Sequence, residues 1–148
     1  MFRIGFDGDE RTKVGGLAVG TIVIGSFRER FESPLHFWQQ PNYEGQWHQA
    51  IRRLVDGAES TALITDLHDP ALANFIRWWP KYQIGAEARI HNQLLFMEHL
   101  REPFDLGDVY AHVPHYEQTT EDGDRLSEWS VPLADLERFV DGRSAEES

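Results

Sequence analysis

The sequence predicts one α+β domain, in which a mainly antiparallel, twisted sheet has about three helices packed on it. Several short apolar runs alternate in the manner of strands, and the connections between them are short. Short connections favour antiparallel pairing, because a parallel crossover needs about a dozen residues or more. The chain has 148 residues, the usual size of one domain. We therefore expect one domain over residues 1–142 and a disordered tail over residues 143–148.

The strands are predicted from β-branched content and from alternation. Thr21-Ile22-Val23-Ile24 lies between glycines and indicates a long strand with room for a bulge. A later alternating run contains Pro80, which cannot donate a backbone hydrogen bond, so this strand is expected at a sheet edge or at a bulge. The predicted strands span residues 2–6, 19–31, 61–67, 75–84, 88–96 and 126–131.

Three helices are predicted from 3.6-residue spacing. The clearest begins after Pro41 with Asn42 as N-cap and stops at Gly57. A short one covers residues 106–113, and a final one begins at residue 133 and stops at Gly142. Between these two helices, Asp122-Gly123 is typical of a hairpin turn.

Acidic residues are concentrated toward the C-terminal end. The chain has 14 Lys plus Arg against 25 Asp plus Glu, which gives a net charge of -11. Residues 104–148 hold 12 acids and 3 bases, so -9 of this charge lies in the last 45 residues. Such a surface repels nucleic-acid phosphates and anionic lipids, and it argues against both as partners.

The composition also limits the compartment and the chemistry. The chain contains no cysteine, which removes thiol catalysis, Cys-ligated zinc and disulfides and suits a reducing compartment. No segment has the pattern of a signal peptide or of a membrane span. We therefore expect a cytoplasmic protein.

Candidate catalytic groupings are weak. His112, His115 and Glu117 could hold zinc or manganese in a small hydrolase, but Pro114 interrupts the helical spacing that would bring them together. No nucleophile elbow, phosphate loop or dinucleotide fingerprint occurs. The sequence therefore predicts no catalysis, no metal and no cofactor, with a metal-dependent hydrolase as the alternative.

Trp79 differs from the other four tryptophans. It lies on the opposite face of its predicted strand from Trp78, between Arg77 and Lys81. Either a second helix covers it, or it is partly exposed to a partner, since aromatic side chains often anchor interfaces.

Several segments occur in an order that resembles the immunity proteins of bacterial contact-dependent growth inhibition (CdiI-like) systems. They cover residues 20–27, 35–38, 43–47, 60–65, 78–82, 91–93 and 122–129, and the last contains Ser127-Glu128-Trp129. The resemblance implies a cytoplasmic α+β protein, without catalysis or cofactor, that binds and neutralises the C-terminal toxin domain of a cognate effector, often a nuclease. It also implies that toxin-contacting residues vary between cognate pairs, whereas Ser127-Glu128-Trp129 maintains the fold.

The acidic region supplies the predicted binding surface. A nuclease needs basic groups to hold phosphates, so an acidic protein can occupy the same groove. We expect Glu117, Glu121, Asp122 and Asp124 to contact the toxin, together with Trp79. Ordinary solubility is the competing explanation for the charge. Single-stranded nucleic-acid binding, through aromatic stacking on a curved sheet, is a third hypothesis that the negative charge opposes.

Overall fold

The computed structural model describes residues 1–7, 16–100, 102–119 and 122–147, without the side chains of residues 143–147. It confirms the predicted α+β class with antiparallel pairing. The elements are β1 (Phe2–Phe6), β2 (Leu17–Ile24), β3 (Phe27–Pro34), α1 (Gln40–Val55), β4 (Ser60–Asp66), β5 (Phe75–Ile84), β6 (Glu87–His91), β7 (Gln93–Phe96), the 3₁₀ helices η2 (Met97–His99) and η3 (Leu106–His112), β8 (Glu128–Pro132) and α2 (Leu133–Glu147). No described helix has the length and apolar content needed to cross a membrane.

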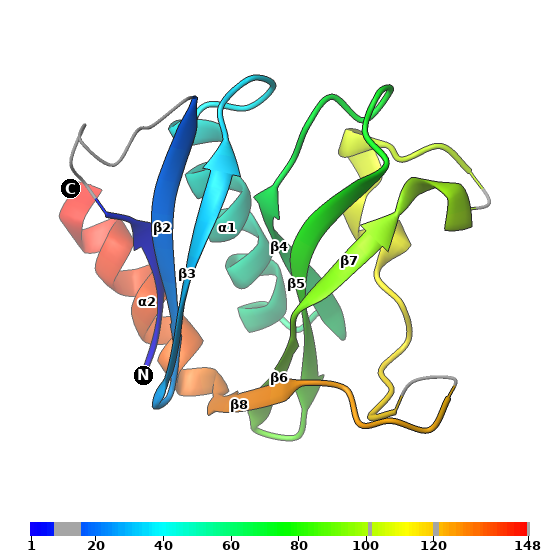
Figure 1. Cartoon of the computed structure of the whole chain (residues 1–148). Helices are drawn as coiled ribbons and strands as arrows, with labels where there is room; N and C mark the ends of the chain where they lie inside the picture. Colours follow the sequence, from blue (N-terminus) through cyan, green and yellow to red (C-terminus); the bar gives the residue numbers. More distant parts are fainter. Residues whose placement is uncertain (8–15, 101, 120–121, 148) are drawn as a thin grey trace.

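The strands form two separate antiparallel sheets (Figure 1). One has the order β1-β2-β3, and the other has the order β4-β5-β6-β8, with β7 paired to β5 beside β6. Strand β8 lies at the lower end of the molecule in Figure 1, and its Trp129 ring stacks on Phe27 of β3 at 4.2 Å between centroids. The last strand therefore ties the two sheets together at one end.

The structure corrects two strand predictions. Residues 19–31 do not form one bulged strand, because Gly25 turns the chain with a positive φ of 63° and separates β2 from β3. The strand with Pro80 is not at an edge, since β5 pairs with β4 on one side and with β6 and β7 on the other, and the register shift between β4 and β5 lies at Ile64/Asp66 rather than opposite Pro80. Pro80 is tolerated there because it falls in the gap between the β6 and β7 pairings, where a missing N–H interrupts no ladder.

The helices differ from the prediction at their ends. Helix α1 has Gln39 rather than Asn42 as N-cap, and the two residues cap each other reciprocally, since Asn42 occupies the third helical position. Residues 106–113 contain a 3₁₀ helix with a kink at Asp108. Helix α2 continues through Gly142 to Glu147, so the predicted stop at that glycine is wrong. The separate tail over residues 143–148 stays a prediction.

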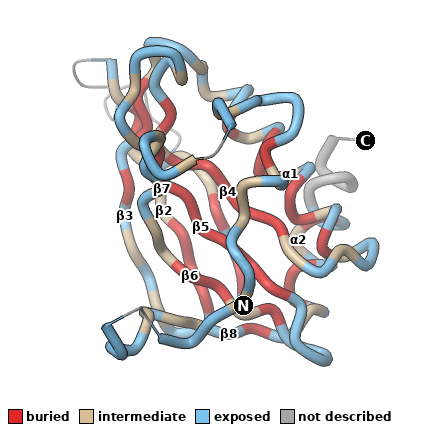
Figure 2. Tube along the Cα trace, turned by 90° about the vertical axis from the view of Figure 1, so that its right-hand side faces the viewer, coloured by how far each residue is buried: buried red, intermediate tan, exposed pale blue. Residues whose placement is uncertain are grey.

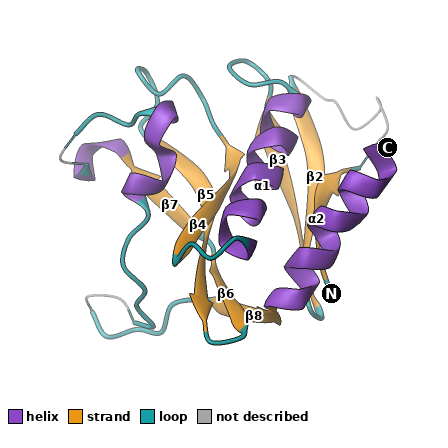
Figure 3. Ribbon diagram, turned by 180° about the vertical axis from the view of Figure 1, so that it is seen from behind, coloured by secondary structure: helices purple, strands orange, loops and turns teal. Residues whose placement is uncertain are grey.

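The core lies between the sheets and the two α-helices. Seen from behind, α1 crosses the junction of β3 and β4 while α2 lies along the first sheet (Figure 3). The tube in Figure 2 is mostly buried along β4, β5 and β6 but largely exposed or intermediate along β3. The apolar face of α1 supplies Tyr43, Trp47, Ala50, Ile51 and Leu54 to the core.

Side chains of α1 close the outer edge of β4. The Gln46 amide donates from Nε2 to the Ala62 carbonyl at 2.8 Å and accepts from the Ile64 N–H at 2.9 Å, as a neighbouring strand would. Trp47 Nε1 donates to the Ile64 carbonyl at 2.7 Å, and the Tyr43 hydroxyl contacts both backbone groups of Leu67 at 3.2 Å. An edge strand exposes unpaired backbone groups that invite strand addition, and here the helix satisfies them.

Candidate functional site: an anchored acidic loop

The predicted acidic residues lie on residues 114–126, which we call the acidic loop. Glu117, Asp122 and Asp124 are all exposed, and Glu121 lies outside the described residues. The loop folds back on itself through a bridge between Thr119 and Arg125. Gly123 has a φ of 87°, which fits the turn expected at Asp122-Gly123. The loop therefore holds several carboxylates toward solvent near one turn.

Glu128 anchors this loop to the second sheet. Its Oε1 accepts a hydrogen bond from the Tyr116 hydroxyl at 2.6 Å and lies 3.0 Å from His91 Nε2, which donates in the matching tautomer. Its Oε2 accepts from Arg89 at 3.2 Å. In the register of β6 and β8, His91 lies directly opposite Glu128. One carboxylate thus joins the loop to two neighbouring strands.

Aromatic packing supports the same anchor. Tyr82 of β5 donates from its hydroxyl to the Pro114 carbonyl at 2.9 Å, which fixes the start of the loop. The Tyr116 ring packs against Tyr82 at 5.2 Å and stacks on His91 at 5.7 Å. Burial, followed by the negative charge of Glu117, raises the pKa of Tyr82 to about 12.

The anchor keeps Glu128 ionised. Partial burial by itself would raise the pKa of Glu128, but the hydrogen bonds from Tyr116, His91 and Arg89 outweigh burial and hold the pKa below its ordinary value. A carboxyl with a lowered folded-state pKa contributes stability above its unfolded pKa and loses that contribution as the pH falls through the folded value. The anchor should therefore weaken in acid.

Replacing Glu128 by glutamine tests this anchor. The amide keeps the shape but loses the charge that attracts Arg89, so we expect a loss of about 1–2 kcal/mol in the free energy of unfolding at pH 7. The difference from wild type should shrink below pH 4.5, the ordinary pKa of the group, when measured by urea unfolding. Glu137→Gln, on the exposed face of α2, is the control. Equal losses at all pH values would contradict the ionic anchor.

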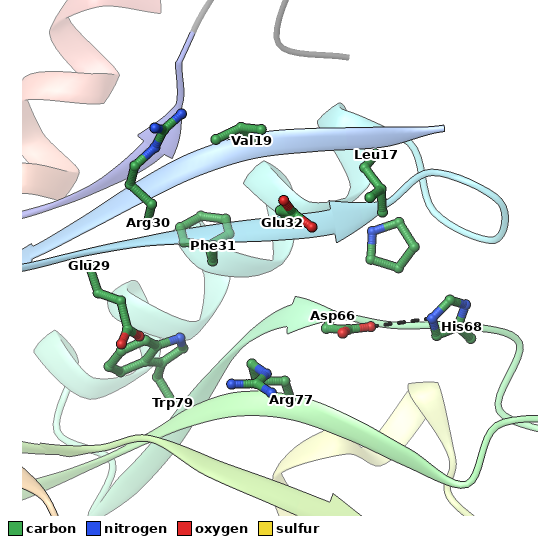
Figure 4. Close-up of a pocket in the computed structure, with 11 residues that line it drawn as sticks. Leu17, Val19, Glu29, Arg30, Phe31, Glu32, Asp66, His68, Arg77 and Trp79 are labelled. Atoms are coloured by element: carbon green, nitrogen blue, oxygen red, sulfur yellow. Dashed lines mark ion pairs between the residues drawn. The ribbon is translucent and has the colours of Figure 1, made fainter. Parts of the chain in front are cut away.

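A cleft lies between the two sheets (Figure 4). It has a volume of about 570 Å³ and lies between β3 on one side and the residues around Asp66 and Arg77 on the other. Burial raises the pKa of Asp66, although the charges of His68 and Arg77 lower it in part. The Asp66 carboxylate lies 3.5 Å from His68 Nε2, too far for a strong hydrogen bond, and its buried Oδ1 has no hydrogen-bond partner among the described residues.

Trp79 lines this cleft but is buried, so the expected partial exposure of its side chain is wrong, whereas its contact with a partner stays a prediction. Its side chain is fully buried, at 0% exposure. It packs against Trp129 at 5.8 Å and faces the cleft wall formed by Glu29 and Phe31 of β3. The alternation along β5 correctly predicts that Trp78 and Trp79 lie on opposite faces of the strand. It does not reveal that a second sheet packs against the Trp79 face.

The alternative metal site is not assembled. Over the described ranges, no group of three or more His, Cys, Asp and Glu residues could hold a metal ion. His112 packs against the Phe104 ring at 5.2 Å, whereas His115 and Glu117 are exposed on the far side of Pro114. The structure therefore does not bring His112, His115 and Glu117 together as a metal-dependent hydrolase would require.

Comparison with known proteins identifies the family. Residues 33–139 match the model of the CdiI N-terminal domain, which covers most of the chain. The chain belongs to the CdiI family. Its similarity to the Immunity protein CdiI of Enterobacter cloacae subsp. cloacae is 26% identity over 136 residues, covering 90% of this chain and 92% of that protein.

A solved structure has the same fold as this CdiI-family chain. It comes from the CdiA-CT/CdiI toxin and immunity complex of Enterobacter cloacae, with a TM-score of 0.87 and 22% identity. The match covers 98% of this chain and 99% of that chain. The predicted resemblance to CdiI-like immunity proteins is confirmed.

Sequence reasoning identified Ser127-Glu128-Trp129 in this CdiI-family chain but missed the partners of Glu128. Tyr82, Arg89, His91 and Tyr116 carry no local pattern that connects them. His91 and Glu128 are 37 residues apart in the sequence and meet only because β6 pairs with β8. The one available signal was the polar His91 in an otherwise alternating apolar run, since a buried imidazole needs a polar partner.

Proposed function

We propose that this chain is a non-catalytic, cytoplasmic immunity protein that binds the C-terminal toxin domain of a cognate contact-dependent growth inhibition effector and blocks it through the acidic loop. The toxin is a nuclease with a basic substrate groove. Family membership and the likeness to a chain of the Enterobacter cloacae toxin and immunity complex support binding of this class of partner. The exposed carboxylates of the loop, in a chain of net charge -11, support a cationic partner surface.

The observation that carries the proposal is the anchoring of the loop. An exposed loop without internal contacts would have to be ordered on binding, which costs about 0.5–1.5 kcal/mol for each immobilised side chain. Here Tyr82 and Glu128 hold the start of the loop, at Pro114 and Tyr116, and the end of the loop leads directly into β8. The carboxylates are thus presented on a preorganised support, while they stay accessible to solvent.

Charge reversal in the loop tests the proposal. We expect the double variant Glu117→Lys, Asp122→Lys to lower the rate of association with the cognate toxin domain by about tenfold at low salt, because complementary charge accelerates encounter. The salt dependence of the rate should flatten as well. Stopped-flow mixing across a salt series measures both quantities.

The matched control reverses the same charge elsewhere. Glu137→Lys with Asp141→Lys changes two exposed carboxylates on α2 and gives the same net charge. It should change the rate much less than the loop variant. An unchanged rate and salt slope in the loop variant would remove the acidic loop as the binding surface, and wild-type protein that does not bind the toxin would overturn the function itself.

A further inference from the structure

The outer edge of β3 is open along the cleft. Strand β3 is the last strand of its sheet and pairs only with β2. The backbone bonds from Asp7 to Val19 and from Gly25 to Met1 show that the odd-numbered residues of β2 point their N–H and C=O groups toward β1. The backbone N–H and C=O groups of the even-numbered β2 residues therefore point toward β3. Their partners there are odd-numbered residues, among them Glu29 and Phe31.

By this register, Arg30 and Glu32 point their backbone N–H and C=O groups away from β2, toward the cleft. No described residue pairs with them on that side. The two residues also line the cleft, which extends along this edge as far as Leu17 and Pro34 (Figure 4). The open backbone groups and the cavity thus occupy the same place.

The outer edge of β4, by contrast with that of β3, has its backbone groups hydrogen-bonded. From helix α1, Gln46 and Trp47 satisfy backbone groups of β4, and the Tyr43 hydroxyl accepts from the N–H of Leu67, just after the strand. On β3, such capping by described residues reaches only Pro34, whose carbonyl accepts from the Tyr43 hydroxyl at 2.7 Å. Edge strands that are neither capped nor paired are where an added strand can bind.

The cleft has polar groups aimed at an occupant. Trp79 is fully buried, its Nε1 has no hydrogen-bond partner among the described residues, and the indole nitrogen faces the cleft in Figure 4. Three carboxylates line the cleft, those of Glu29, Glu32 and Asp66, against two guanidinium groups. One of these, Arg30, lies 3.9 Å from Asp7 and points away from the cleft. The lining therefore favours a cationic occupant that also offers a hydrogen-bond acceptor.

We propose that an extended segment of the cognate toxin adds to β3 as a fourth strand. Its main chain bonds to Arg30 and Glu32, a carbonyl accepts from Trp79 Nε1, and a Lys or Arg side chain lies against Glu29 and Asp66. This inference rests on the proposed function, because it names a second contact of the same partner. About four residues of such a strand span roughly 13 Å, enough to pass both open residues.

Amide hydrogen exchange followed by NMR gives the direct test. In the free protein, the Arg30 and Glu32 amides should exchange rapidly, because no described backbone acceptor faces them. In the complex with the toxin domain, we expect both to slow by at least about tenfold, as strand amides do when paired. A bound complex with both amides still exchanging rapidly would overturn this inference and leave the proposed function intact. A toxin domain that does not bind wild-type protein would overturn both.

Proline substitution gives a second test. Arg30→Pro removes the N–H that would bond to the toxin, whereas Arg30→Ala removes only the side chain. We expect Arg30→Pro to raise the dissociation rate about tenfold relative to Arg30→Ala, measured by surface plasmon resonance. Arg28→Pro is the matched control, since its N–H also points outward but Arg28 does not line the cleft. Equal rates for Arg30→Pro and Arg30→Ala would contradict strand addition.

The side-chain part of the inference has its own variant. Glu29 lines the cleft and accepts from Asn92 at 3.3 Å through one carboxylate oxygen. Glu29→Gln should weaken toxin binding about threefold to tenfold and lower its salt dependence, because the cationic side chain loses its counter-charge. Unchanged affinity and salt dependence would exclude a cation beside Glu29. The amide-exchange result decides strand addition independently of that outcome.

Discussion

Replacing Gln46 by alanine is expected to lower the free energy of unfolding by about 2–4 kcal/mol, because the loss leaves the Ala62 carbonyl and the Ile64 N–H buried without partners. Leaving a buried backbone group unsatisfied costs about 1–3 kcal/mol. The cost of the two unsatisfied groups together therefore exceeds the cost of the lost side-chain packing. Urea unfolding followed by tryptophan fluorescence measures the change.

Gln49→Ala is the matched control for this variant. It changes the same residue type on the same helix, but Gln49 is exposed and accepts one hydrogen bond from Tyr110 at 3.2 Å. We expect its cost to stay below about 1 kcal/mol, since water can replace that bond. Similar losses in the two variants would mean that α1 does not stabilise the edge of β4 through the Gln46 amide.

Lys81→Met is expected to raise the free energy of unfolding by about 1–4 kcal/mol at pH 7, the range seen when apolar side chains replace buried ionic groups. Lys81 has 0% exposure, and its Nζ has no hydrogen-bond partner among the described residues. The Nζ atom lies 3.4 Å over the Phe2 ring, but a cation–π contact contributes only about 2 kcal/mol. Desolvation of an ammonium costs more, so burial lowers the pKa of Lys81 well below its ordinary value of 10.5.

The pH dependence separates this effect from better packing. When the folded-state pKa is lowered, the unfolded chain binds an extra proton at pH values between the folded and the unfolded pKa, so wild-type stability is reduced there and recovers as the pH rises toward 10.5. The advantage of Lys81→Met over wild type should therefore be larger at pH 7 than at pH 10, in urea unfolding at both pH values. A methionine variant less stable than wild type at pH 7 would show that the Phe2 ring retains the charged amine.

The two proposed contacts divide the binding process between them. In the proposed complex, the exposed carboxylates of the acidic loop would act at long range and set the association rate, which added salt would lower. Backbone pairing at β3 acts only after contact and affects the dissociation rate. Variants in the loop and at Arg30 should therefore change different kinetic constants of the same complex.

Local patterns predicted much of the fold. The helix after Pro41 and the strands near residues 61–67 and 75–84 follow from spacing and alternation, and the structure has them as α1, β4 and β5. The division of residues 19–31 into β2 and β3 does not follow from the local pattern, because a glycine that flanks a strand and a glycine that forms a turn look alike in sequence, and only the structure shows the positive φ of Gly25. The continuation of α2 past Gly142 was not predicted either. A glycine at that position is compatible with the inside of a helix as well as with its end.

The sequence by itself determined the fold class, the concentration of acid after residue 104 and the resemblance to CdiI-like proteins, because composition, periodicity and the order of short segments are local properties. Only the tertiary structure decided that Glu128 holds Tyr116 and His91, that Trp79 is buried between the sheets, and that β4 is capped while β3 is open. The physical reason is that each of these depends on which strands and helices become neighbours. Burial and hydrogen-bond partners belong to pairs of distant residues, and no single segment records them.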